Sequence, residues 1–282
     1  MNFFDLHCDT PFECYKQNKE FYVNSLAVSG ESGEIFDRWK QVFAVWIRDD
    51  EDNPFKTYKE ILKDFKARLK TAPKNLTPYF AVEGGAVIER DADNLFALNQ
   101  DGIKLLTLTW NGENNIAGGV YSEKGLTDFG KSAIEIMNRL KIGCDLSHIN
   151  EKGFYKAIEI ADFPLATHSN CKEICLHKRN LSLEQIELIC EKNGVIGLNF
   201  YPLFLGENVF DKIYQNIFYL LDKGYQDNIA IGSDFDGAKM DKSLDKISKI
   251  PTLYEFLEAK GINKAILNKI FFENADNFIA KL

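Results

Sequence analysis

Residues 3–9 read Phe3-Phe4-Asp5-Leu6-His7-Cys8-Asp9, a short apolar run that ends in polar side chains. The same pattern returns along the chain at 41–47, 76–83, 102–110, 141–148, 164–168, 194–200 and 228–234. Apolar runs of this length are typical of strands buried on both faces, as in a parallel sheet. The sequence therefore predicts eight β-strands.

Segments with helical periodicity separate these strands. They lie at 56–71, 127–140, 151–160, 183–192 and 209–223, and a last one at 264–282 is expected to close the fold. Ser182 and Gln185 predict a capping box at one helix start, and Gly224 predicts a helix end. Eight strand–helix units favour an α/β fold closed into a (β/α)8 TIM barrel over an open doubly wound sheet. No GxGxxG follows the first strand, which disfavours nucleotide binding.

Length and composition agree with one such barrel. The 282 residues contain no low-complexity linker and no obvious repeat, so we predict a single domain over 1–282. The formal charge of −8, without a Lys/Arg cluster, disfavours nucleic acid and anionic membrane surfaces as partners. The apolar runs are too short to span a bilayer, and MNFFDLHCDT does not read as a secretory signal. With no CxxC pair among six cysteines, we expect free thiols and a cytoplasmic protein.

Polar residues capable of binding a metal stand at five of the predicted strand ends. They are His7, Asp9, Glu83, His148, His168 and Asp234. In a TIM barrel these ends meet at one rim, where active sites are built, and imidazole and carboxylate groups are zinc ligands. Taken alone, each residue also has an ordinary structural explanation, as a hydrogen-bonded histidine, an acidic loop residue or a turn residue. Because those explanations must hold at five strand ends at once, the sequence predicts a metal centre.

A series of short motifs strengthens this prediction. They are DLHCDTP (5–11), FAVEGG (80–85), LTLTWN (106–111), CDLSH (144–148), THSN (167–170), KRN (178–180), GLNFYP (197–202) and GSDFDG (232–237). In this order they resemble the renal (membrane) dipeptidase family, zinc peptidases of the amidohydrolase-like barrel superfamily. The resemblance runs through nearly the whole chain.

The resemblance implies a dinuclear zinc dipeptidase. His7 and Asp9 would bind one zinc ion and His148 and His168 the other, while Glu83 and a water or hydroxide would bridge the two. That hydroxide would be the nucleophile, because zinc lowers the pKa of bound water toward about 7.

The same resemblance assigns further residues. Asp234 would be the acid/base residue, and Arg179 would bind the free carboxylate of the substrate. Asn199 and Tyr201 would line the pocket. Dipeptides, including those with a D-residue at the C-terminal position, would be the substrates, and family members often form homodimers.

Three neighbouring residues are expected to be structural rather than catalytic. Asp236 is interpreted as a turn residue and the competitor of Asp234, Cys8 as a packing residue that points away from the ligands, and His177 as a surface or supporting residue.

One position departs from the family. Mammalian members have a histidine after LTLT, where this chain has Trp110 followed by Asn111. An indole donates one hydrogen bond but carries no charge, so Asn111 or a zinc ion would stabilise the oxyanion, or Trp110 only packs at the rim. The departure motivates one alternative, in which the same metals act on an N-acyl amino acid or lactam. A separate alternative is a non-catalytic, metal-stabilised barrel.

Overall fold

The computed structural model describes all 282 residues as an α/β barrel, as predicted. Every predicted strand is present, although the last five are shorter than expected. The strands are β1 (Asn2–Cys8), β2 (Arg38–Trp46), β3 (Leu76–Glu83), β4 (Ile103–Thr107), β5 (Gly143–Asp145), β6 (Pro164–Leu165), β7 (Ile196–Leu198) and β8 (Ile229–Ile231). All pairings are parallel, in the order β6-β5-β4-β3-β2-β1-β8-β7.

The ring closes between β6 and β7 through one parallel bridge. Ala166, just beyond β6, pairs with Ile196. The Ala166 amide donates to the carbonyl of Val195 at 3.0 Å, and the Gly197 amide donates to the carbonyl of Ala166 at 2.8 Å. The barrel therefore has a seam that is held by far fewer backbone bonds than the extended β2–β3 pairing.

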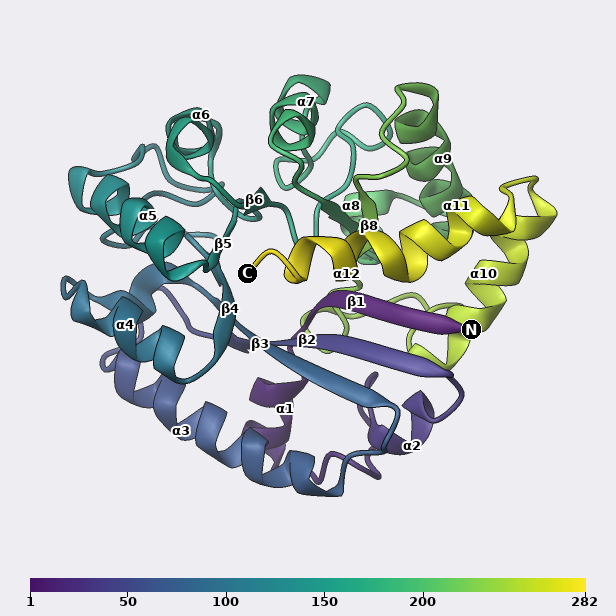
Figure 1. Cartoon of the computed structure of the whole chain (residues 1–282), viewed down its shortest axis with the longest axis horizontal. Coiled ribbons are helices and arrows are strands. Elements are labelled where there is room, and N and C mark those ends of the chain that lie inside the picture. The colour runs from purple at the N-terminus through teal and green to yellow at the C-terminus, as the bar shows by residue number, and fades with distance from the viewer.

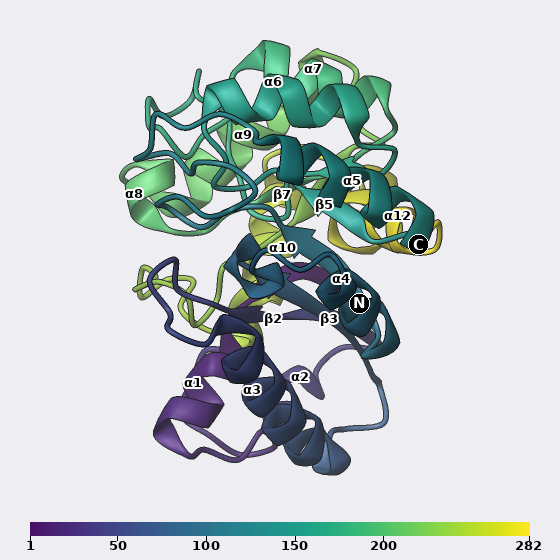
Figure 2. The same cartoon turned by 90° about the vertical axis from the view of Figure 1, so that its left-hand side faces the viewer.

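Helices surround the barrel, as Figures 1 and 2 show. They are α1 (Thr10–Gln17), α2 (Gly30–Gly33), α3 (Pro54–Arg68), α4 (Asp93–Gln100), α5 (Asp128–Leu140), α6 (Glu151–Ile160), α7 (Leu183–Glu191), α8 (Pro202–Leu205), α9 (Val209–Asp222), α10 (Ile250–Ala259), α11 (Lys264–Asn268) and α12 (Asn274–Ile279). The predicted capping box of Ser182 and Gln185 begins α7, and Gly224 with φ 85° follows α9. None of these helices has both the length and the apolar character needed to cross a membrane.

The C-terminal segment closes the N-terminal opening of the barrel. The helix predicted over 264–282 consists of α11, a π-helical turn (Lys269–Glu273) and α12, which follow one another directly. Figure 1 shows this segment, in yellow, lying across the strands. Phe272 and Phe278 pack with Phe4, Val42 and other strand residues in one buried cluster. The functional side chains lie at the other ends of the strands.

Candidate metal centre and active site

A β-bulge at the end of β1 orients the first two site residues. Asp5 pairs with residue 41 of β2 and Cys8 pairs with residue 43, so three steps along β1 match two along β2. One extra residue on a strand reverses the alternation of its side chains beyond that point. Cys8 consequently packs in the core between strands and helices, whereas His7 and Asp9 turn toward the other strand ends.

Six side chains from five strand ends converge at the rim. Their ligand atoms form three groups in which all atoms lie within 4.8 Å of one another: His7, Asp9 and Glu83; Glu83, His148 and His168; and His7, His168 and Asp234. Glu83 belongs to the first two groups. Its Oε1 lies 2.8 Å from His148 Nε2 and 3.3 Å from His168 Nε2, and its Oε2 lies 3.7 Å from His7 Nε2.

Hydrogen bonds set the orientation of two of the imidazoles. Asn111 Oδ1 lies 2.9 Å from His148 Nδ1. The Thr167 hydroxyl donates to Asp145 at 2.7 Å, so it accepts from His168 Nδ1, also at 2.7 Å. With both Nδ1 atoms donating, both Nε2 atoms carry lone pairs, and these two atoms face each other at 2.9 Å. Lone pairs that converge in this way suit a shared cation.

The ionisation of the cluster agrees with this interpretation. Burial, together with the positive charges of Arg179 and His7, holds the pKa of His148 and that of His168 well below the usual range, so both rings are neutral. Burial also lowers the pKa of His7, but the neighbouring carboxylates, Glu83 first, outweigh it and raise that pKa to about 10. Burial and the charge of Asp9 raise the pKa of Glu83 well above its usual range. The carboxylates of Asp9, Glu83 and Asp234 thus crowd around His7 in a buried site, where a metal ion would take the place of the proton that they favour on its ring.

Two further observations fit a metal ion. His7 Nε2 and Asp9 Oδ1 are buried and have no hydrogen-bond partner, an arrangement that costs free energy unless a ligand satisfies them. Gly237 leaves space beside them, because a Cβ atom there would collide with the carboxylates of Asp9 and Asp234. The donor set of imidazoles and carboxylates matches zinc and other divalent transition metals.

Two buried carboxylates that are not ligands support the rim, and the sequence reasoning missed both roles. Asp145 accepts hydrogen bonds from the hydroxyls of Thr107 and Thr167 at 2.6 and 2.7 Å, which ties β4, β5 and β6 together. Asp5 accepts from Ser233 Oγ at 2.6 Å and Gln41 Nε2 at 2.9 Å, which ties β1 to β8 and β2. In the sequence, each of them is an acidic residue in an apolar strand that stands two or three positions before a histidine.

Asp234 lies at the mouth of the cluster in a left-handed conformation, with φ 63°. Its Oδ2 accepts from Asn199 Nδ2 at 2.9 Å, and burial raises the pKa of the carboxyl to about 6. Asn199 is fully buried, so the structure places it against Asp234 and not in the wall of the cavity. Asp236 is the alternative candidate for the acid/base role. Its carboxylate already accepts hydrogen bonds from the Thr10 hydroxyl and the Ala27 amide, both at 2.7 Å.

Arg179 lies beside the cluster with most of its donors unused. Its side chain is buried, its Nε has no partner, and its one side-chain hydrogen bond is a long contact of 3.4 Å from Nη2 to the carbonyl of His168. The guanidinium lies over the Phe204 ring, with 5.4 Å between Cζ and the ring centroid. His177 accepts from the Arg179 amide at 3.1 Å and so supports this loop.

A cavity of about 380 Å³ opens over Asp9, Glu83, His148 and Asp234. One wall is aromatic. Trp110 packs edge to face against Trp46, with 5.0 Å between the ring centroids, and Trp46 packs in the same way against Phe12, with 4.8 Å between the centroids. Other lining residues are Asn111, Tyr201 and Phe204. The structure thus places Trp110, Asn111 and Tyr201 at the cavity, and Asn111 in addition holds His148.

Known proteins resemble this chain in sequence and fold. The model of the membrane dipeptidase family (peptidase family M19) matches residues 55–279. An uncharacterized protein from the pqqA 5′ region of Klebsiella pneumoniae is 32% identical over 209 residues, which are 68% of this chain and 77% of that protein. An uncharacterized dipeptidase of Schizosaccharomyces pombe is 29% identical over 209 residues, 70% of this chain, and the match spans about half, 51%, of its length.

The fold also matches a solved structure. A metallo peptidase from Rhodobacter sphaeroides, liganded with a phosphinate mimic of the dipeptide L-Ala-D-Ala, superposes with a TM-score of 0.92 at 21% identity, covering 100% of this chain and 99% of that one. At that identity the likeness shows the fold alone. The family model, in contrast, spans most of the chain and includes Glu83, His148, His168 and Asp234. The chain belongs to the membrane dipeptidase family, peptidase family M19, and is a metallo-dipeptidase.

Proposed function

We propose that the chain hydrolyses the peptide bond of dipeptides with two zinc ions. His7, Asp9 and Glu83 would hold one ion, and Glu83, His148 and His168 the other. The observation that carries the proposal is that two compact ligand groups share Glu83 beside a buried arginine with unused donors. When bound, the ions would supply Lewis-acid activation of the scissile carbonyl and of water.

Asp234 is the proposed acid/base residue. Its pKa of about 6, raised by burial, lets the carboxyl accept and release a proton near neutral pH. The 2.9 Å hydrogen bond from Asn199 fixes the carboxylate beside the ligand cluster. Asp234 would take a proton from the attacking water and deliver it to the amine that leaves.

Arg179 would select short substrates. A planar guanidinium forms paired hydrogen bonds with a carboxylate, and Arg179 has its Nε free for this purpose. Arg179 lies next to the main chain of His168, a proposed metal ligand, so a carboxylate that it binds would stand close to the scissile bond, as in a dipeptide. The phosphinate mimic of L-Ala-D-Ala bound to the R. sphaeroides protein supports extending the substrates to a D-residue at this position.

The test is release of free amino acids from a dipeptide panel by purified protein, with metal content measured on the same sample. We expect about two zinc ions per chain and hydrolysis of dipeptides. Tripeptides and dipeptides with an amidated C-terminus should be hydrolysed much more slowly. Equal turnover of dipeptides and tripeptides would contradict the role of Arg179, and an inactive zinc-loaded protein would contradict the whole proposal.

A second candidate substrate class is another small amide, such as an N-acyl amino acid. The aromatic wall of Phe12, Trp46 and Trp110 favours it, because these rings offer a broad apolar surface to an acyl chain. Comparison of N-acetyl amino acids with the matching dipeptides distinguishes the two. Family membership argues against the third alternative, a non-catalytic barrel.

We also propose that residues 1–282 act as one domain. The C-terminal α12 packs against β1 and β8, so the two ends of the chain complete a single core. Figure 2 places both termini at the same end of the molecule.

A further inference from the structure

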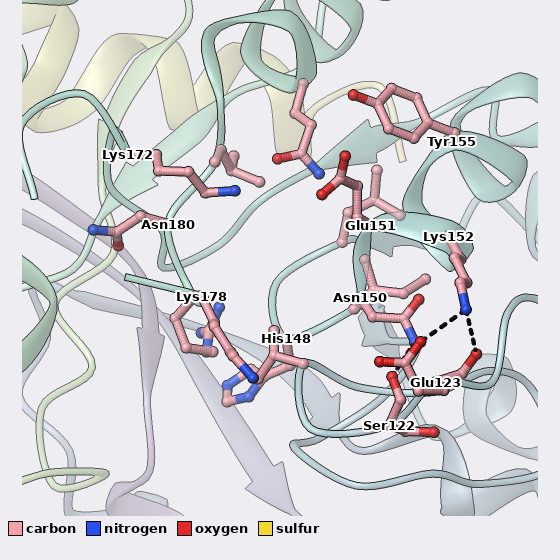
Figure 3. Close-up of a pocket in the computed structure, with 16 residues that line it drawn as sticks. Ser122, Glu123, His148, Asn150, Glu151, Lys152, Tyr155, Lys172, Lys178 and Asn180 are labelled. Atoms are coloured by element: carbon pink, nitrogen blue, oxygen red, sulfur yellow. Dashed lines mark hydrogen bonds and ion pairs between the residues drawn. The ribbon is translucent and has the colours of Figure 1, made fainter. Parts of the chain in front are cut away.

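A second cavity adjoins the site on the side of Arg179 (Figure 3). Its volume is about 560 Å³, and it lies between the loop that carries Lys172 and Lys178 and the beginnings of α6 and α7. Arg179 and His148 both line it, and His148 also lines the cavity over the metal centre, so the two cavities adjoin one another. The proposed function above assigns no role to this space.

The cavity carries excess positive charge. Its lining has four cationic side chains, Lys152, Lys172, Lys178 and Arg179, against two carboxylates, Glu123 and Glu151. The whole chain, by contrast, has a formal charge of −8. Acidic molecules are repelled from most of such a surface, so a local cationic pocket is selective for them.

The cations are not equivalent. Lys152 is neutralised by Glu123, whose Oε2 lies 2.8 Å from its Nζ. Neither Lys172 nor Lys178 forms an ion pair; Lys178 only lies near the Tyr121 ring, at 5.6 Å from the centroid. Figure 3 shows the Lys172 side chain extending into the space between the drawn residues. Two lysines and the buried Arg179 are therefore available to an anionic ligand.

We infer that the residue at the C-terminal position of the substrate carries an acidic side chain, which the cavity beside Arg179 receives. This inference rests on the proposed function. Side chain and α-carboxylate branch from the same carbon atom, so a residue held by Arg179 must direct its side chain into neighbouring space. There its carboxylate meets Lys172 and Lys178, while Leu146 and Ile149 offer apolar contacts to its methylene groups.

The test compares acidic substrates with their uncharged isosteres. The values of kcat/KM are measured for Ala-Glu and Ala-Gln and for Ala-Asp and Ala-Asn, each with an L- and a D-residue at the second position. We expect the acidic member to be favoured about tenfold or more, as for hydrogen bonds to a charged group. The preference should weaken at high salt, because screening acts on exposed lysines.

Variants identify the cations responsible. Lys172→Ala and Lys178→Ala should each lower the ratio of kcat/KM for the acidic over the neutral substrate, and the double variant should bring it close to one. The double variant K152A/E123A is the matched control, because it removes an existing ion pair from the lining without changing the net charge of the cavity, and it should leave the ratio unchanged. The charge-reversed variant K172E/K178E should instead favour Ala-Lys.

The possible results distinguish a failure of the acidic preference from a failure of dipeptide hydrolysis itself. A wild-type enzyme that hydrolyses Ala-Glu and Ala-Gln equally well overturns the acidic preference but leaves dipeptide hydrolysis intact. An acidic preference that survives in K172A/K178A overturns the assignment of this cavity. Failure to hydrolyse any dipeptide overturns the proposed function together with the inference.

Discussion

At the residue scale, Asp234→Asn tests the proposed proton transfer. The amide keeps the shape of the side chain and an oxygen for Asn199, but it cannot carry the proton. We expect kcat to fall by roughly 10²–10⁴ while metal content and melting temperature stay close to wild type. The measurement is steady-state hydrolysis of a dipeptide alongside metal analysis.

The matched control is Asp236→Asn, two residues further on. Its carboxylate accepts hydrogen bonds from Thr10 and from the Ala27 amide, so this change should lower thermal stability more than activity. If Asp236→Asn lost activity and Asp234→Asn kept it, the two assignments would have to be exchanged.

Arg179→Lys tests recognition of the substrate carboxylate. Lysine keeps the charge but loses the planar pair of donors. We expect KM to rise by roughly 10- to 100-fold with a smaller change in kcat, the range typical of a hydrogen bond to a charged group. Ala-Ala-amide serves as the control substrate. Because it lacks the carboxylate, its KM should differ little between wild type and the variant.

At the element scale, Thr167 links the end of β6 to the site. Its hydroxyl donates to Asp145 and accepts from His168 Nδ1, so it holds both the strand end and the ring of a proposed ligand. Thr167→Val should weaken metal binding by roughly 10- to 100-fold, as is usual for partners of metal-bound histidines. Thr167→Ser retains the hydroxyl and should bind metal like wild type in a competition titration with a chelator; equal loss in both variants would refute this role.

The elements also show how far the sequence predicts this structure. The eight strands follow from apolar runs, and the start of α7 follows from Ser182 and Gln185, because both signals are local. The bulge in β1 does not follow from a local signal, since it depends on the pairing of β1 with β2. Strict alternation would have placed His7 on the same face as Asp5, away from the other ligands.

Much of the candidate site was equally predictable, because strand ends meet at one rim in this fold. The residues named at those ends are close together in the structure. The use of Asn111 to hold His148, the contact of Asn199 with Asp234 and the support from Asp5 were not foreseeable. They depend on distances between residues far apart in the chain, which no local pattern reports.

At the scale of the whole molecule, removal of metal should lower stability. The rim contains the buried carboxylates of Asp9, Glu83 and Asp234 together with buried ring nitrogens, and some of these atoms lack partners. A ligand that binds only the folded state stabilises it by about 2.7 kcal/mol at a concentration 100 times its Kd. We expect a chelator to lower the melting temperature by several degrees and added zinc to restore it, as measured by calorimetry. An unchanged melting temperature would show that the folded chain holds no metal there.

The unequal length of the strands has a consequence for how the two ions would be released. His7 and Glu83 stand at the ends of β1 and β3, and Asp9 directly follows β1; both strands pair with β2 over long stretches. His148 and His168 follow β5 and β6, strands of only three and two residues beside the seam of the barrel. Local opening of that weaker half would free the second ion while the first stays bound. Metal should then leave in two kinetic phases, through a half-loaded species that could accept a different metal in the vacated position.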